Sequence, residues 1–134
     1  MVCACRFIFA EKREMNDKQA KGQAGEQLAR EYLQTNGYAI LEANWKWGHL
    51  EVDIIAMKEN TIVFVEVKTR SSDRMAPPEA AVNSQKQNNL FRAANTFVTR
   101  RGYNCEVRFD IISIVQSVEG TQLEHIPDAF TPRW

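Results

Sequence analysis

The strongest constraint on the fold is a pair of apolar runs that flank one short polar segment. Residues 51–57 and 61–69 are rich in Val, Ile and Phe, and the lysine, glutamate and asparagine at 58–60 between them favour a turn. Two strand-like runs joined by so short a connection form an antiparallel hairpin. We therefore expect a β-hairpin at the centre of the chain.

The register of this hairpin places four ionisable side chains on one face. If the turn is centred on residues 59–60, Asp53 lies opposite Glu66 and Glu51 lies opposite Lys68. Like charges that face each other cost roughly 0.2–1 kcal/mol, so the two opposed carboxylates need a cation. The same register gives the other face an apolar composition: Val52, Ile54, Ala56, Val63, Val65 and Val67.

Two interpretations of the charged face remain open. Two carboxylates beside a lysine meet the minimum for metal-assisted hydrolysis of a phosphate ester. The alternative is an exposed hairpin on which Glu51 and Lys68 form a cross-strand ion pair that contributes little.

The flanking segments predict two helices. Residues 17–36 repeat apolar side chains at intervals of three and four, and Gly37 supplies a C-terminal stop. After Pro77 and Pro78, either Asn83 or Ser84 caps a second helix that Gly102 ends.

Further strands are expected at residues 38–43, 106–115 and 123–126, the last after a turn at Glu119 and Gly120. The order αβββαββ predicts an α/β fold in which a central mixed β-sheet is flanked by helices. We expect residues 16–134 to form this domain and residues 1–15 to be an N-terminal extension, with Met15 as the natural start.

Composition narrows the classes of function. The 17 basic and 17 acidic side chains cancel, so the chain cannot hold a long nucleic acid through net charge alone. No apolar run reaches the roughly 20 residues that cross a bilayer, so no membrane association is expected. The odd count of three cysteines favours a reducing compartment, and we expect a cytoplasmic protein.

Several other kinds of site do not fit the sequence. His49 and Glu51 match the first half of a zinc deaminase motif, but no Pro-Cys-x-x-Cys follows. No glycine-rich phosphate loop with a lysine is present, which leaves nucleoside triphosphate binding without support.

An ordered series of residues resembles a known family. It comprises Gly22, Gly25-Glu26-x-x-Ala29, Gly37-Tyr38, Asn44, Glu51-x-Asp53-Ile54-Ile55-Ala56, Val63-Phe64-Val65-Glu66-Val67-Lys68-Thr69-Arg70, Lys86, Arg108-Phe109-Asp110 and Ala129-Phe130. This series is similar to the YraN family of bacterial proteins within the PD-(D/E)xK nuclease superfamily, which has a restriction endonuclease-like fold and includes Holliday junction resolvases. Two positions depart from the pattern: Val52 replaces the usual proline and Leu50 the usual glycine.

The resemblance implies a metal-dependent nuclease site. Asp53 and Glu66, with the Val67 carbonyl, would bind Mg²⁺ or Mn²⁺, and Lys68 would orient water and stabilise charge on phosphate. Glu26 takes the place of a helix glutamate that joins the metal site in the similar resolvases. Glu51 is the remaining candidate ligand.

Three further residues carry expectations. Lys86 and Arg70 are candidates for contact with nucleic acid. Lys86 shares the helical phase of apolar residues, so its side chain either reaches the site or packs along the core with its ammonium in water. We expect Asp110 to be structural and to pair with Arg108 or a backbone donor.

The most direct hypothesis is an endonuclease that hydrolyses phosphodiester bonds in DNA, including branched or structured DNA. The alternative is a non-catalytic nucleic-acid-binding or scaffold protein that keeps the nuclease fold. The balanced charge and small size also favour a homodimer or a protein partner that helps to hold the substrate.

Overall fold

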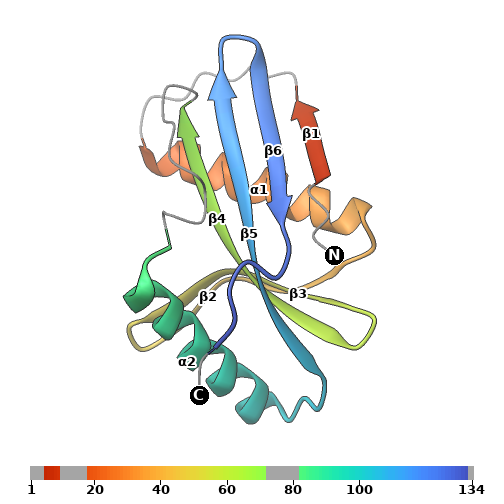
Figure 1. The fold of residues 1–134 in the computed structure, drawn as a ribbon, viewed down its shortest axis with the longest axis vertical. Helices are drawn as coiled ribbons and strands as arrows, with labels where there is room; N and C mark the ends of the chain where they lie inside the picture. The colour runs from red at the N-terminus through yellow and green to blue at the C-terminus, as the bar shows by residue number, and fades with distance from the viewer. Residues whose placement is uncertain (1–4, 10–17, 72–81, 133–134) are drawn as a thin grey trace.

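The computed structural model describes residues 5–9, 18–71 and 82–132, which form one sheet and two helices (Figure 1). The elements in chain order are β1 (Cys5–Phe9), α1 (Lys18–Thr35), β2 (Ala39–Trp47), β3 (Leu50–Lys58), β4 (Thr61–Ser71), α2 (Ser84–Arg101), β5 (Glu106–Ser117) and β6 (Gly120–Ile126).

The six strands form a single mixed sheet in the order β1-β6-β5-β4-β3-β2. Only the central pair, β4 and β5, is parallel, and α2 makes the connection between these two strands. Helix α1 crosses behind the sheet, and α2 lies against its other face near β2 and β3 (Figure 1). The predicted α/β class with a mixed sheet flanked by helices is confirmed, and the arrangement is compatible with a restriction endonuclease-like fold.

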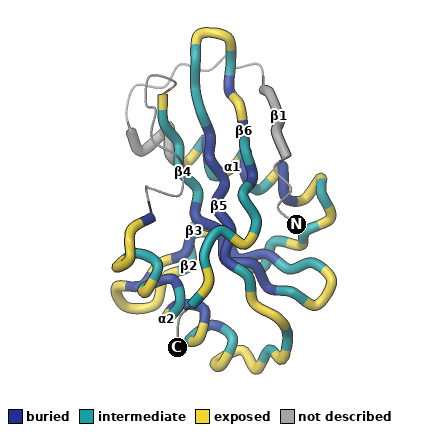
Figure 2. Tube along the Cα trace, viewed as in Figure 1, coloured by how far each residue is buried: buried dark blue, intermediate teal, exposed yellow. Residues whose placement is uncertain are grey.

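Each helix buries its apolar side against a different face of the sheet. Ala29, Tyr32 and Leu33 of α1 pack on one face. Leu90, Ala93 and Phe97 of α2 pack on the other. Burial is concentrated in the middle of β3, β4 and β5, which are therefore covered on both sides (Figure 2). This two-sided core fixes the strands that carry the candidate site.

The ends of α2 follow the expected capping chemistry. The Asn83 side chain accepts a hydrogen bond from the backbone N–H of Lys86, which makes Asn83 rather than Ser84 the N-cap. Gly102 adopts the left-handed conformation with a φ of 70° and ends the helix. The predicted limits of α2 are thus confirmed.

The N-terminal region differs from the expectation in one respect. Cys5–Phe9 is a strand, β1, that pairs antiparallel with β6, whereas the αβββαββ order contained no strand there. Met15, Pro77 and Pro78 lie outside the described residues, so the start at Met15 and the break before α2 stay predictions.

Neither α1 nor α2, the two helices of the described part, has the length and apolar character that crossing a bilayer requires. Cys105, at the start of β5, is a free thiol.

Candidate functional site

The candidate site lies where β3 and β4 stop pairing. Near the turn, the observed register is the predicted one. It pairs Lys58 with Thr61 and continues as far as Ile54 with Val65, where the pairing of β3 with β4 ends. Beyond this point β4 continues alongside β5 as far as Ser71. The expected backbone pairing of Asp53 with Glu66 and of Glu51 with Lys68 is therefore wrong, because β4 separates from β3 before reaching those positions. The charged residues lie at the resulting fork.

The Asp53 side chain takes over the role of the missing backbone partner. Its Oδ2 accepts a hydrogen bond of 2.8 Å from the backbone N–H of Val67, which β3 no longer pairs. A buried backbone donor without a partner is costly, so this bond stabilises the fork. It also fixes the Asp53 carboxylate against the segment that carries Glu66 and Lys68.

A reversal of side-chain direction accompanies the fork. Val52 packs with the α2 cluster and Ile54 with the α1 cluster, although residues two apart in a regular strand share a face. The prediction that Val52 joins the face of Ile54 and Ala56 is therefore wrong. On the neighbouring strand, Asn44 has a left-handed φ of 53°, which asparagine tolerates better than most residues. The irregularity thus spans β2 and β3 at Asp53.

Burial and charge make Asp53 hard to ionise. Removal from water, together with the negative charges of Glu66 and Glu26, raises the pKa of the Asp53 carboxyl to about 7. The hydrogen bond from Val67 and the positive charge of Lys86 oppose this rise only in part. Asp53 is therefore a carboxyl whose charge a neighbouring cation would control.

Glu66 forms ion pairs with two lysines. Its carboxylate is nearly fully buried, with 4% of the side chain exposed, and its Oε2 lies 2.8 Å from Lys86 Nζ and 3.3 Å from Lys68 Nζ. Burial alone would lower the Lys86 pKa, but the hydrogen bond and charge of Glu66 outweigh it, so the pKa is raised and the ammonium form is favoured. Of the two alternatives for Lys86, the structure selects the one in which the side chain reaches the site.

Helix α1 brings a third carboxyl toward the fork. Burial raises the Glu26 pKa; Asn44 and Arg30 lower it, and the charges of Glu66 and Glu51 raise it further. The helix approaches β4 closely because Gly25 has no side chain: a Cβ there would collide with Thr69 Oγ1. Gly25 thus permits the contact that puts Glu26 in the field of the other carboxyls.

Two connected depressions lie on the α2 side, and the smaller one adjoins the fork. The smaller, of about 310 Å³, has a lining that includes Glu51 and Lys86. The larger, of about 1010 Å³, runs along α2 and shares Gln85 and Asn89 with the first. Lys86, which contacts Glu66, therefore faces solvent on the side of α2.

Comparison with known proteins places the chain in a family. The family model described as uncharacterised protein family UPF0102 matches residues 25–114. The chain belongs to family UPF0102. The resemblance to the YraN family is thereby confirmed. The matched stretch contains all the candidate site residues, from Glu26 to Lys86.

Curated UPF0102 proteins align with most of this chain. One from Parabacteroides distasonis is 44% identical over 109 residues, which cover 81% of this chain and 90% of the relative. One from Christiangramia forsetii is 45% identical over 109 residues, with 81% and 92% covered. One from Geobacter metallireducens is 47% identical over 110 residues, with 81% and 90% covered.

The donor chemistry of this UPF0102 site suits a hard divalent cation. Asp53, Glu66 and Glu26 offer carboxylate oxygens, the ligands that Mg²⁺ and Mn²⁺ prefer, and their mutual repulsion favours an added positive charge. Within residues 23–71 and 82–132, however, no three Asp, Glu, His or Cys side chains converge closely enough to hold a metal ion. Lysine ammonium groups balance Glu66 in this arrangement. A metal would have to compete with them.

The remaining candidates are more peripheral. Glu51 is exposed; it lines the smaller depression with Lys86, and its charge contributes to the raised Glu26 pKa. Arg70 lies two residues beyond Lys68 on β4, opposite Val115 of β5. The assignments of Glu51 and the Val67 carbonyl as ligands, and of Arg70 as a nucleic-acid contact, stay predictions.

A second polar cluster lies on the α1 face of the sheet. Asp110, which is fully buried, accepts two hydrogen bonds from Arg108, one from the backbone N–H of Asp128, and lies 2.6 Å from His125 Nε2. The other ring nitrogen of His125 is 2.9 Å from the Tyr32 hydroxyl of α1. Burial would raise the Asp110 pKa, but the hydrogen bonds from His125 and Arg108 outweigh it and lower the pKa.

This cluster confirms the structural interpretation of Asp110, including both its Arg108 partner and a backbone donor. The sequence interpretation missed His125. Extending the β5–β6 hairpin from its turn gives the available signal, because His125 pairs with Ile112 and thus falls beside Asp110 on the same face.

Proposed function

We propose that this chain is a divalent-metal-dependent phosphodiesterase that acts on DNA. The single observation that carries the proposal is the geometry at the strand fork, where the Val67 N–H holds the Asp53 carboxylate beside Glu66 and its two lysines. Carboxyls whose pKa is strongly raised by burial and neighbouring charges, as that of Asp53 is to about 7, are frequent in catalytic sites. The resemblance to PD-(D/E)xK nucleases supports the same assignment.

The charge of each site residue suggests its role. Asp53 and Glu66, with the Val67 carbonyl and with Glu26 as a further ligand, would hold Mg²⁺ or Mn²⁺. Such an ion supplies a Lewis acid for a phosphate oxygen and a more acidic bound water. Hydrolysis forms a bond from the water oxygen to phosphorus and breaks the bond to the leaving alkoxide, which takes up a proton. Lys68 would orient the water and stabilise negative charge that develops on the phosphoryl oxygens.

Lys86 would have a different part. In the structure its ammonium neutralises Glu66, so it keeps the carboxylates compatible with one another before a metal arrives. If a metal took its place at Glu66, the ammonium of Lys86 would be free to contact a phosphate oxygen. By such an exchange, carboxylates that do not converge in this arrangement would become a metal site.

The alternative is a non-catalytic nucleic-acid-binding or scaffold protein. It is favoured by one observation, the pairing of Glu66 with both Lys68 and Lys86, which satisfies the buried carboxylate without any metal. In this case the fork is a structural ion cluster.

The test is calorimetric Mn²⁺ titration of wild type, Asp53→Asn, Glu66→Gln and the exposed control Glu119→Gln, followed by incubation of each with linear, nicked and four-way DNA. The proposal expects wild type and the control to bind Mn²⁺ and cleave DNA. It expects both site variants to lose binding, and cleavage to fall by at least about a hundredfold. Wild type that neither binds Mn²⁺ nor cleaves would favour the structural cluster.

A further inference from the structure

The composition of α2 is unlike that of the rest of the chain. The whole sequence carries equal numbers of acidic and basic side chains, 17 of each. Helix α2 contains four basic residues and no aspartate or glutamate along its 18 residues. A neutral protein has therefore gathered an excess of positive charge on the helix beside its candidate site.

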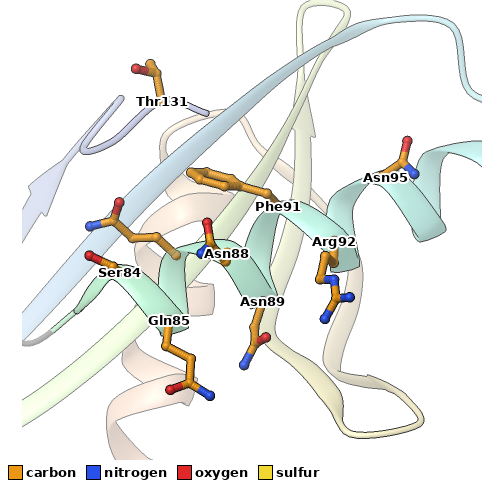
Figure 3. Close-up of a pocket in the computed structure, with 9 residues that line it drawn as sticks. Ser84, Gln85, Asn88, Asn89, Phe91, Arg92, Asn95 and Thr131 are labelled. Atoms are coloured by element: carbon orange, nitrogen blue, oxygen red, sulfur yellow. The ribbon is translucent and has the colours of Figure 1, made fainter. Parts of the chain in front are cut away.

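The solvent side of α2 is lined by hydrogen-bond donors. We call this surface the α2 outer face; it consists of Gln85, Asn88, Asn89, Arg92 and Asn95. Gln85, Asn89 and Arg92 project toward the same side of the helix in Figure 3, as expected for residues four and three apart. Arg92 is exposed and makes no ion pair with any residue in the described ranges. The donors of this face are thus available to a ligand.

The α2 outer face leads directly to the candidate site. The depression of about 1010 Å³ along the helix and the depression of about 310 Å³ at the fork share Gln85 and Asn89. Lys86 lines the second depression, and its ammonium contacts Glu66. A DNA strand that lies along α2 would therefore reach Glu51 and Lys86, the residues through which the site meets the surface on this side.

We propose that the α2 outer face binds the phosphodiester backbone of the DNA on which the fork acts, an inference that rests on the proposed function. Phosphate oxygens accept hydrogen bonds and carry negative charge, and side-chain amides and guanidinium groups are common donors to them. Contacts of this kind are independent of sequence. They supply locally the attraction that a chain with zero net charge lacks overall.

Charge-matched variants test the inference through binding rather than cleavage. Arg92→Gln combined with Asn95→Asp lowers the net charge by two on the α2 outer face. Gln34→Glu combined with Gln122→Glu makes the same change at exposed positions on α1 and β6. Affinity for a short fluorescein-labelled duplex is measured by anisotropy in EDTA over a series of salt concentrations, after circular dichroism confirms that both variants fold.

The α2 variant should bind about tenfold more weakly, and the slope of log affinity against log salt should decrease by about one. The control pair should match wild type within about twofold. Equal loss in both pairs, or no loss in either, would overturn the inference, as would wild type that does not bind the duplex.

Cleavage by the same samples with Mn²⁺ separates this inference from the proposed function. Binding that depends on the α2 outer face without any cleavage by wild type supports the DNA-binding face and rejects the hydrolase. Cleavage by wild type with binding indifferent to the α2 variant rejects the face and keeps the hydrolase.

Discussion

At the scale of single residues, Asp53 is where structure and chemistry are most closely linked. Its carboxylate satisfies the Val67 N–H, and this structural task holds it beside Glu66 in a poorly solvated position. The same surroundings raise its pKa to about 7. Fold stability and the proposed cation binding would therefore depend on the same proton.

Replacing Asp53 by asparagine should stabilise the metal-free protein at alkaline pH. The folded-state pKa of about 7 exceeds the ordinary value of 3.8, so stability from the bound proton is lost as pH rises through that interval. The asparagine side chain would keep an acceptor for Val67 N–H and carry no charge. We expect the free energy of unfolding of Asp53→Asn in EDTA to exceed that of wild type by on the order of 1–3 kcal/mol at about pH 8, and by less at about pH 5. Urea unfolding across this pH range measures the difference in free energy of unfolding. A difference that stays constant with pH would contradict the prediction.

Lys86→Met should have opposite effects on metal and on DNA. Removing the ammonium 2.8 Å from Glu66 Oε2 removes the competitor for that carboxylate, so Mn²⁺ affinity should rise by roughly tenfold. Cleavage should fall, because the group that would reach a phosphate is gone. Calorimetry and a cleavage assay measure the two effects, with Lys58→Met at the far end of the hairpin as control. Weaker Mn²⁺ binding by Lys86→Met would show that the lysine supports the site rather than competing for it.

Residue identities allowed much of the candidate site to be predicted. Asp53, Glu66, Lys68 and Lys86 do gather in one place, and Asp110 pairs with Arg108 as expected. The hairpin register of β5 and β6 already places His125 beside Asp110, but the contact of His125 with Tyr32 escaped prediction because α1 is distant in sequence from these strands. Local periodicity carries no information about such contacts.

At the scale of elements, the hairpin shows where local rules end. The turn at residues 59–60 fixes the register of β3 and β4 near the turn, and this register was predictable from the sequence. The point at which this pairing stops was not predictable. It depends on β4 continuing alongside β5, a strand that follows α2 in the chain. Strand β1 escaped prediction for a similar reason: its apolar run is short, and its pairing with β6 is long-range.

The approach of α1 to β4 gives a prediction about two elements. Gly25→Ala would ordinarily stabilise a helix by up to about 1 kcal/mol. Here the new Cβ collides with Thr69 Oγ1, so we expect a net loss of about 1–3 kcal/mol in the free energy of unfolding. Thr69→Ala removes that oxygen, so the double variant should recover most of the loss. Urea unfolding of all four members of this cycle provides the measurement, and additive effects of the two changes would count against the contact.

At the scale of the whole molecule, the buried cluster around Asp110 joins α1, β5 and β6. Arg108→Leu would leave the fully buried Asp110 without its guanidinium, and we expect a loss of about 3 kcal/mol. Arg101→Leu breaks a more exposed pair with Glu42 and should cost less than about 1 kcal/mol. Chemical denaturation compares the two, and similar losses would mean that the cluster does not hold the layers together.

The opposite pKa shifts of Asp110 and Asp53 should shape the pH profile of the entire protein. Stability due to Asp110, whose pKa is lowered, is lost as pH falls through its folded pKa, whereas stability due to Asp53 is lost as pH rises through about 7. The metal-free protein should therefore be most stable in mildly acidic solution. The proposed Mn²⁺ site requires the ionised Asp53, so stabilisation by the ion, about 2.7 kcal/mol at a hundredfold excess over Kd, should appear chiefly at and above about pH 7. Melting temperatures measured across a pH series, in EDTA and in Mn²⁺, test this. In wild type, the pH of highest melting temperature should be higher in Mn²⁺ than in EDTA, whereas in Asp53→Asn it should be the same in both. The same Mn²⁺ shift in both proteins would place the ion elsewhere on the molecule.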